Sequence, residues 1–481
     1  MKDGLYYADL LKNKKLQQSE LIALMKQKIQ DQQVLNAFVT LEQTPTATDV
    51  QPQQSELFAG LPIPLKILGQ NKAGWLATSS SRLFKEQRAT VTNHFVRALE
   101  KSGLTPFGQT NAPEFGFKNV TDPVLYGATR NPWNLDYSPG GSSGGAAASV
   151  AAGIFPIAGA SDGGGSIRIP ASFCGLIGLK PTRGTIPTGP DGWRDWQGAA
   201  INFALTVSMR DTKTLFYALR GQHPAAPYQA PKVEWQAPEV MSRPLKIAVC
   251  LTSPVGTKVS AAAVAAVNEA VDFLAAAGHT VKEIHYPLDG KSLIGSYYQM
   301  NGAETAAMFQ TIQTNLQRTV TKSDMELMSW GIYQSGLKLS AAEYSIALQK
   351  WDQAAFVMEE LFNEFDLFLS PTTAFPAPKL ATDLQSDSIR QQLTRAEELS
   401  AAACEDLIYA MFEKSLTLTP YTQLANLTGQ PAISLPTYVT KEHLPLGIQF
   451  MAAKGREDLL FTIGELFETA GKFKLPKAYQ N

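Results

Sequence analysis

The stretch from Tyr137 to Ile167 constrains the fold of this chain more than any other part of it. Its 31 residues include 9 of the chain's 36 glycines but only one charged residue, Asp162. Charged residues make up 18% of the whole chain, against about 25% in an average soluble protein. A segment this poor in charge and this rich in small residues is expected to be buried, with its backbone packed closely against its surroundings.

The uncharged run over residues 137–161 is long enough to mimic a membrane span, but its composition argues against one. It is rich in Gly, Ala and Ser rather than Leu, and it contains Pro139 and Pro156. The first residues of the chain lack the order of a signal peptide, and the three cysteines form no C-x-x-C motif. We therefore expect a cytoplasmic protein without a membrane partner.

The overall charge excludes another class of partner. Lys and Arg number 42 against 43 for Asp and Glu, which is not the basic footprint of a nucleic-acid-binding protein. The five histidines are scattered without the spacing of metal ligands, so we expect no metal site.

Helix and strand patterns alternate along the whole length, which favours one large α/β domain over residues 1–481. A helix over 259–276 between strands at 246–249 and from Thr280 forms a β-α-β pattern. The weakest boundary is the Pro-rich stretch 221–244, which could be a surface connection. The other expected elements are a helix over 5–34 and strands at 35–39, 61–68, 365–371, 431–436 and 446–450.

A short motif in the glycine-rich stretch admits a hydrolase of the α/β-hydrolase type. Gly140-Gly141-Ser142-Ser143-Gly144 satisfies the G-x-S-x-G pattern of a nucleophile elbow. Such an esterase would use Ser142 or Ser143 and a later histidine, for which His443 is the candidate. A match of this kind is common by chance in a Gly/Ser-rich run.

A wider pattern is more specific. The glycines run Gly140-Gly141-Ser142-Ser143-Gly144-Gly145, followed by Ser161-Asp162-Gly163-Gly164-Gly165-Ser166-Ile167-Arg168 and Gly178-Leu179-Lys180-Pro181-Thr182. This pattern resembles the amidase signature family of Ser-cisSer-Lys hydrolases. The 24 residues between Ser142 and Ser166 match the family's spacing, and Lys66 follows a short strand where the family places its lysine.

The resemblance extends over about residues 5–470, because two C-terminal motifs match as well. These are Asn426-Leu427-Thr428-Gly429-Gln430-Pro431 and Gly447-Ile448-Gln449. It implies an α/β fold in a single large domain, with a central mixed β-sheet covered on both faces by α-helices and a signature core at about 60–215. It also implies a small-molecule amide substrate, no cofactor, a monomer or a homodimer, and a cis peptide bond between Gly141 and Ser142.

Amide hydrolysis explains why these residue types occur together. Ser166 is the expected nucleophile, and Lys66, if neutral, serves as its base through the hydroxyl of Ser142. A neutral lysine requires burial away from carboxylates, which the charge-poor segment would provide. The N–H groups of Gly163, Gly164 and Gly165, with that of Ser166, are the expected donors to the oxyanion.

Neighbouring residues receive structural interpretations. Ser143 is expected to have a structural or helix N-terminal role. Asp162 and Arg168 are expected to hold the loop by pairing or by backbone hydrogen bonds, and Cys174 to pack in the core.

The walls of the acyl pocket are less constrained by motifs. Trp193 and Trp196, in a loop after the signature motif, are candidates for aromatic walls, and Phe375 is a third.

One alternative stays within the family. The chain could be the glutaminase subunit of a tRNA-dependent amidotransferase, which would need partner subunits. Transamidating members have Tyr-Gly-Arg-Val after the Lys-Pro-Thr motif, whereas this chain has Arg183-Gly184-Thr185-Ile186. This departure disfavours the glutaminase.

Overall fold

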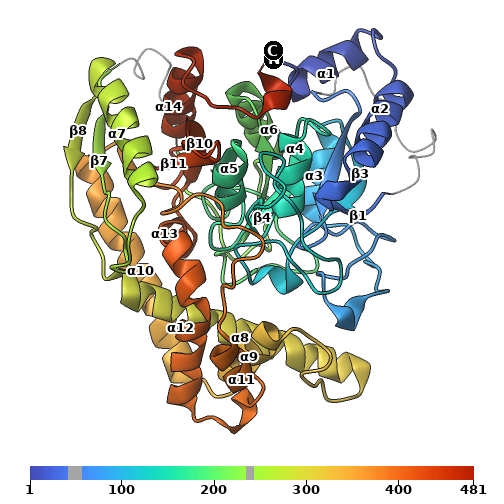
Figure 1. Ribbon diagram of the computed structural model, residues 1–481, viewed down its shortest axis with the longest axis vertical. Helices are drawn as coiled ribbons and strands as arrows, with labels where there is room; N and C mark the ends of the chain where they lie inside the picture. Colours follow the sequence, from blue (N-terminus) through green and yellow to red (C-terminus); the bar gives the residue numbers. More distant parts are fainter. Residues whose placement is uncertain (42–56, 234–242, 481) are drawn as a thin grey trace.

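An eight-stranded mixed sheet flanked by helices forms the main body of the molecule (Figure 1). The structure is a computed structural model that describes residues 1–41, 57–233 and 243–480. The strand order is β4-β6-β5-β10-β11-β9-β7-β8. The bounds are β4 Ala158–Asp162, β5 Ile177–Lys180, β6 Ile201–Thr206, β7 Lys246–Val249, β8 Thr280–Glu283, β9 Leu367–Pro371, β10 Ala432–Val439 and β11 Pro445–Met451.

The direction of the strands divides this sheet into two parts. Strands β7, β8 and β9 are mutually parallel, whereas the neighbours from β4 to β9 pair antiparallel. Helix α7 (Ala261–Ala276) connects β7 to β8, which confirms the predicted β-α-β unit. The expected α/β fold with a mixed sheet is therefore confirmed.

Lys66 lies in the interior of the molecule, at the end of a strand in a smaller sheet of three strands. Its order is β1 (Phe38–Thr40), β3 (Leu104–Thr110) and β2 (Leu61–Lys66), with β2 parallel to β3. Every residue of β2 is buried, and the strand packs beside β4. Because Lys66 is the last residue of β2, its position is fixed by a strand without solvent contact.

The glycine-rich segment forms interior structure rather than a membrane span. Helix α4 (Gly144–Ala151) is buried along its whole length, and the chain then enters the central sheet as β4. Helix α5 (Arg168–Cys174) follows and is also completely buried. Among the described residues, no helix combines the length and apolar character needed to cross a membrane.

The predicted N-terminal helix over 5–34 is wrong in one respect, since the structure has two helices there. Helix α1 (Gly4–Lys12) ends before Lys14, whose φ of 54° is left-handed. Helix α2 (Gln18–Asp31) begins with a capping box, in which the Gln17 N–H donates to Glu20 Oε2 at 2.8 Å. The apolar spacing continues across this break, so periodicity alone did not reveal it.

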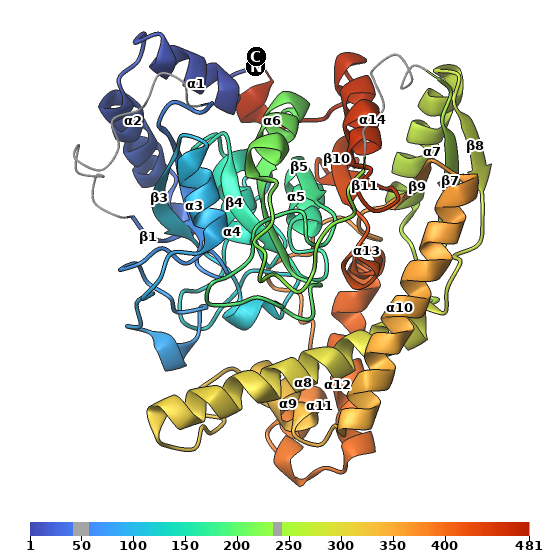
Figure 2. The ribbon, with the colours of Figure 1, turned by 180° about the vertical axis from the view of Figure 1, so that it is seen from behind.

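A group of helices forms a separate layer at one end of the molecule (Figure 2). It consists of α8 (Gly290–Leu316), α9 (Leu327–Gly336), α11 (Asp387–Leu393) and α12 (Ala401–Leu418), while α10 (Ala341–Glu364) runs from this layer towards β7 and β8. The remaining helices are α3 (His94–Lys101), α6 (Met209–Leu219), α13 (Gln423–Thr428) and α14 (Glu457–Thr469), with short 3₁₀ turns at Gln33–Leu35, Arg82–Phe84, Glu114–Gly116, Ala396–Glu398 and Lys477–Tyr479.

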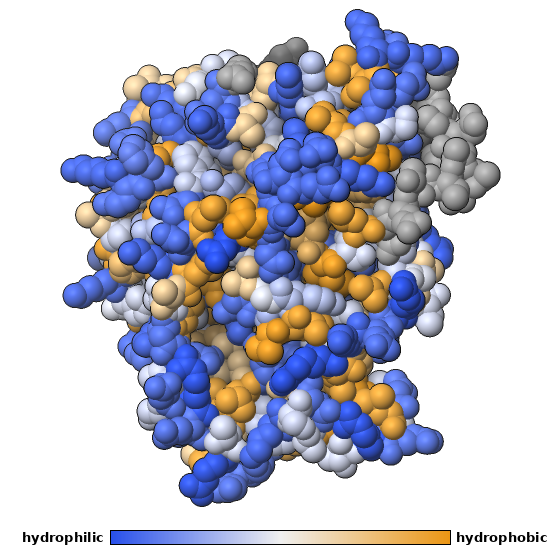
Figure 3. All heavy atoms as spheres, turned by 45° about the vertical axis from the view of Figure 1, so that its right-hand side comes forward, coloured by the Kyte–Doolittle hydropathy of each residue, from blue (hydrophilic) through white to orange (hydrophobic). Residues whose placement is uncertain are grey.

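The possible surface connection at 221–244 is described only in part. Residues 221–233 are mostly exposed, and residues 234–242 lie outside the described residues. The boundary of the signature core at about 60–215 stays a prediction. On the face drawn in Figure 3, hydrophilic side chains are interspersed with small hydrophobic patches.

Two helical glycines provide a matched test of close packing. A Cβ at Gly145 would lie 2.4 Å from the Asn111 nitrogen, whereas a Cβ at Gly295 in α8 would meet no atom within 4 Å. Gly145→Ala should therefore lower the free energy of unfolding by about 1–3 kcal/mol through overpacking. Gly295→Ala should raise it by about 0.5–1 kcal/mol, because alanine favours the helix. Urea unfolding of both variants tests this, and equal effects would contradict the packing of α4.

Candidate active site

Lys66 and Ser142 are in direct contact inside the protein. The Lys66 Nζ lies 2.7 Å from Ser142 Oγ and donates a second hydrogen bond to Ser161 Oγ at 2.9 Å. The Lys66 side chain has no exposed surface. These contacts join the small sheet, the glycine-rich loop and strand β4 at one point.

Burial sets the protonation of this lysine. Removal from water lowers the pKa of Lys66 to about 7, while the negative charge of Asp162 acts in the opposite direction. Above this pH the amine is mostly neutral and can accept a proton. The structure thus supplies the dry surroundings that the charge-poor sequence predicted.

Ser142 and Ser166 line the same cavity. The peptide bond between Gly141 and Ser142 is cis, as the family resemblance implies. The Ser143 N–H donates to the carbonyl oxygen of Ser166 at 3.3 Å, which ties the two loops together. No hydrogen bond joins the side chains of Ser142 and Ser166, both of which the structure describes. The first link of the predicted relay is therefore present, and the second stays a proposal.

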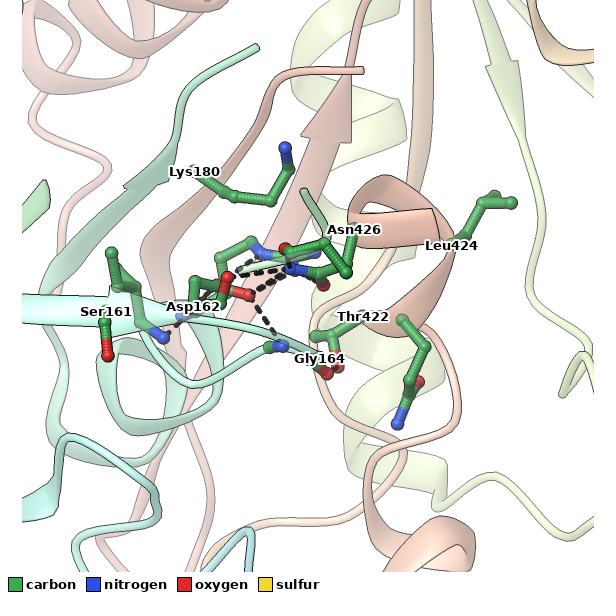
Figure 4. Close-up of polar contacts among 12 residues, drawn as sticks. Ser161, Asp162, Gly164, Lys180, Thr422, Leu424 and Asn426 are labelled. Carbon is green, nitrogen blue, oxygen red and sulfur yellow. Dashed lines mark hydrogen bonds and ion pairs between the residues drawn. The ribbon is translucent and has the colours of Figure 1, made fainter. Parts of the chain in front are cut away.

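A buried ion pair between Asp162 and Arg168 organises the loop that carries Ser166 (Figure 4). Arg168 donates from Nη2 to Asp162 Oδ1 at 2.9 Å and from Nε to Oδ2 at 3.0 Å, and both side chains are fully buried. The same carboxylate accepts the backbone N–H groups of Gly165 at 2.7 Å and Ile167 at 3.2 Å. The predicted role of this pair in holding the loop is confirmed.

The charge of Asp162 is secured by these contacts. Burial alone would raise the pKa of Asp162, but the neighbouring Arg168 and the hydrogen bonds from Arg168 and Asn426 lower it to about 2. The carboxylate is therefore ionised throughout the neutral range.

Two C-terminal residues complete the cluster, and the sequence had marked them only as parts of motifs. Arg168 donates from Nη1 to Gln449 Oε1 and from Nη2 to Asn426 Oδ1, each at 2.7 Å. Asn426 in turn donates to Asp162 Oδ1 at 2.8 Å (Figure 4). One chemical argument could have identified these two residues from the sequence. A buried guanidinium has more N–H donors than one carboxylate can accept, so Arg168 needs further acceptors, and the C-terminal motifs offer them.

The three glycines before Ser166 do not share one role. Gly163 and Gly164 line the cavity, and within the described residues no hydrogen bond occupies their N–H groups. Gly165 lies outside the cavity lining and its N–H is bound to Asp162, so it is not free to face an oxyanion. With φ at 124° and Thr422 Oγ1 only 2.2 Å from a Cβ built on it, position 165 requires glycine for its backbone. Of the four N–H groups expected to bind an oxyanion, those of Gly163, Gly164 and Ser166 stay a prediction, and that of Gly165 is withdrawn.

The cavity has a volume of about 440 Å³ and lies between the catalytic loops and the helical layer. Helices α8 and α12 supply part of its wall, so the layer in Figure 2 is part of the site. Its apolar lining consists of Leu68, Phe115, Phe117, Ile169, Trp196, Ile201, Tyr297, Tyr298, Met308, Phe412 and Leu416.

Of the three predicted pocket residues, only Trp196 lines this cavity. Its Nε1 donates to Asn301 Oδ1 at 2.7 Å, which fixes the indole against α8. Trp193 instead packs against the stacked rings of His94 and His223, with ring centroids 5.6 and 5.0 Å away. The backbone φ is 24° at Asp195 and 54° at Trp196, so the chain turns between the two tryptophans. The indoles of Trp193 and Trp196 therefore lie in different surroundings.

Phe375 also lies outside the cavity lining. The prediction that Trp193 and Phe375 form walls of the pocket is therefore wrong. Phe375 follows the end of β9, where the chain turns away from the central sheet. The sequence could not give this direction.

Ser143, Cys174 and His443 are not placed to act as nucleophile or base. Ser143 exchanges hydrogen bonds with the backbone of Ser161, at 3.2 and 3.3 Å. Cys174 is buried, and burial raises the pKa of its thiol. His443 lies exposed in the turn between β10 and β11 and does not line the cavity.

Comparison with known proteins agrees with this geometry. The family model described as Amidase matches residues 20–461. The chain belongs to the amidase family. The resemblance inferred from the glycine, serine and lysine motifs is thereby confirmed.

Individual relatives extend the match to nearly the whole chain. A lipoamidase of Enterococcus faecalis is 39% identical over 98% of this chain, which spans 64% of that relative's length. A 6-aminohexanoate-cyclic-dimer hydrolase of Paenarthrobacter ureafaciens is 33% identical over 87% of this chain and 85% of its own. A substrate-complexed structure of a 6-aminohexanoate cyclic dimer hydrolase superposes with a TM-score of 0.85 at 29% identity, over 99% of this chain and 98% of that one. Together they indicate an enzyme that hydrolyses an amide C–N bond.

The buried ion pair gives a test of the site's stability. Asp162→Asn should lower the free energy of unfolding by about 3–5 kcal/mol, because Arg168 is left as an uncompensated buried charge. The double variant Asp162→Asn/Arg168→Met removes that charge and should recover part of the loss. Denaturant unfolding with activity measured in parallel checks this. A single variant as stable as the parent would contradict the pairing.

Proposed function

We propose that this chain hydrolyses the amide of an apolar carboxylic acid through an acyl intermediate on Ser166. The observation that carries the proposal is the contact between the fully buried Lys66 amine and Ser142 Oγ, in the cavity that Ser166 also lines. The contact supports Lys66 as the base and Ser166 as the nucleophile, with the Ser142 hydroxyl passing the proton between them.

Acylation begins with attack of Ser166 Oγ on the amide carbon. Ser142 accepts the proton of Ser166 and passes its own proton to neutral Lys66. The carbonyl oxygen becomes an oxyanion, which the N–H groups of Gly163, Gly164 and Ser166 stabilise. These donors are held in place by the loop that Asp162 and Arg168 brace.

Collapse of the tetrahedral intermediate breaks the C–N bond. The proton stored on Lys66 returns through Ser142 to the leaving nitrogen, so the product departs as a neutral amine. Water then attacks the acyl-Ser166 ester while the same relay removes its proton. The second collapse releases the carboxylic acid and restores Ser166.

The cavity favours an apolar or aryl acyl group. Its aromatic and aliphatic lining and its volume of about 440 Å³ suit a small molecule with a hydrophobic body. Among the relatives' names, lipoamidase fits such an acyl group, so lipoyl-type amides are the first substrates to try. A cyclic amide is the second candidate, since the cyclic-dimer hydrolase matches over most of both chains.

The remaining expectations are proposed on narrower grounds. The expected location in the cytoplasm is consistent with three cysteines that are all buried and free. A monomer or a homodimer that acts without a cofactor stays part of the proposal. The glutaminase and esterase alternatives each have one observation against them. Arg183 is used to bind the carbonyl oxygens of Asn426 and Leu427, each at 2.7 Å, and His443 lies away from both serines.

The pH dependence tests the base. Because Lys66 must be neutral, kcat/KM should rise about tenfold per pH unit below pH 7 and level off above it. Rates measured from about pH 5.5 to 9.5 check this, with the folded state monitored by circular dichroism as a control. A flat profile across neutrality would remove Lys66 as the base.

The nucleophile can be identified by direct chemistry. Ser166→Ala should lower kcat/KM by at least ~10⁴-fold. Ser143→Ala serves as the neighbouring control, and it and His443→Ala should stay active. Mass spectrometry of a slowly deacylating ester or anilide should find the acyl mass on the peptide bearing Ser166. An adduct on the peptide with Ser142 and Ser143 would point to the esterase mechanism.

A further inference from the structure

A second cavity lies next to the first and shares two lining residues with it. Its volume is about 420 Å³, and both Lys118 and Ser415 line the two cavities. The two cavities therefore adjoin at Lys118 and Ser415. The wall of the second cavity also includes Val120, Thr121, Asp122, Lys379, Ala381 and Arg390.

The second cavity lies on the Ser142 side of the site. A Cβ built on Gly116 would be 3.4 Å from Ser142 Oγ, and one built on Gly141 would be 2.7 Å from the Val120 nitrogen. Thr121 Oγ1 also donates to the Gly140 carbonyl at 2.9 Å. The segment 116–122 thus runs along the loop that carries Ser142, and four of its residues line the second cavity.

The proposed mechanism indicates which part of the substrate lies on this side of Ser142. In the proposed mechanism the leaving nitrogen takes its proton from Ser142, so the amine half of the substrate lies beside that hydroxyl. We propose that the second cavity binds this leaving amine, and that it selects an amine with a distant carboxylate, an ω-amino acid. This inference rests on the proposed function and names its substrate class.

The charges in the second cavity support a carboxylate. Lys118 is occupied, since its Nζ lies 2.7 Å from Glu326 and 3.2 Å from Asp122. Arg390 is likewise paired with Asp383 and Asp387.

Lys379 has no ion pair within the described part of the chain. Its ammonium lies 6.0 Å from the ring centre of Tyr137, and the side chain is exposed. It is the cation of this cavity that is available to an incoming carboxylate.

The test compares three leaving groups on one acyl chain. The substrates are octanamide, N-alkyl octanamides, and N-octanoyl ω-amino acids of four to eight carbons. Lys379→Gln should lower kcat/KM by at least about tenfold for the ω-amino acid of best length. It should leave octanamide and the alkylamides within about twofold. Lys350→Gln, an exposed lysine on α10, is the matched control.

A second variant tests the cavity rather than the charge. Ala381→Trp should fill space in the second cavity and lower kcat/KM for alkylamides and ω-amino acid amides, but not for octanamide, whose leaving group is ammonia. Ala342→Trp on the exposed face of α10 controls for a surface indole.

Two results would overturn the inference. One is an equal effect of Lys379→Gln on all three substrate types, or no effect on any. The other is a loss of octanamide hydrolysis by Ala381→Trp as large as the loss for the longer amides. Failure of the proposed function looks different, because Ser166→Ala would then still hydrolyse octanamide.

Discussion

The site depends on a pair of opposite charges that are buried together, Asp162 and Arg168. Taking both ions out of water is costly, and only dense hydrogen bonding offsets that cost. Here the carboxylate accepts backbone N–H groups from its own loop, and the guanidinium reaches Gln449 and Asn426. The pair thereby fixes the path of the chain from β4 to α5, and with it the N–H groups that face the cavity.

The same pairing protects the proposed base. The negative charge of Asp162 acts to raise the pKa of Lys66, but burial outweighs it and the pKa falls to about 7. Arg168 pairs with the same carboxylate, and its positive charge opposes the influence of Asp162 on the lysine. The electrostatics of the base therefore follow from the arrangement that shapes the oxyanion loop.

A second lysine shows why burial alone does not make a base. Lys180 is also buried, and burial lowers its pKa well below the usual range. Its Nζ donates to the Pro181 carbonyl at 2.7 Å, and a carbonyl oxygen has no proton to pass on. Lys66 differs because its partners are the hydroxyls of Ser142 and Ser161, which can both accept and donate.

Much of this was predictable where local chemistry decides. Strands such as β7, β9 and β11 follow from apolar runs. The cis bond before Ser142 and the contact between Lys66 and Ser142 were expected from the resemblance to the amidase signature family. The break between α1 and α2 was missed because the leucine spacing continues through a left-handed residue. Trp193 and Phe375 were misplaced because the direction of a loop side chain depends on long-range partners. Gly165 was misplaced because its N–H is bound by the nearby Asp162 carboxylate. Asn426 and Gln449 were visible as motifs, but only the fold brings them to Arg168.

The hydrogen bond between Arg168 and Gln449 has a consequence for biosynthesis, since the two residues are 281 positions apart. Ser142 and Ser166 are translated early, but their loop acquires its brace only after β11 has left the ribosome and paired with β10. A nascent chain thus carries the reactive serines for most of its synthesis without the cluster that organises them. Completion of the central sheet and completion of the catalytic centre are the same event.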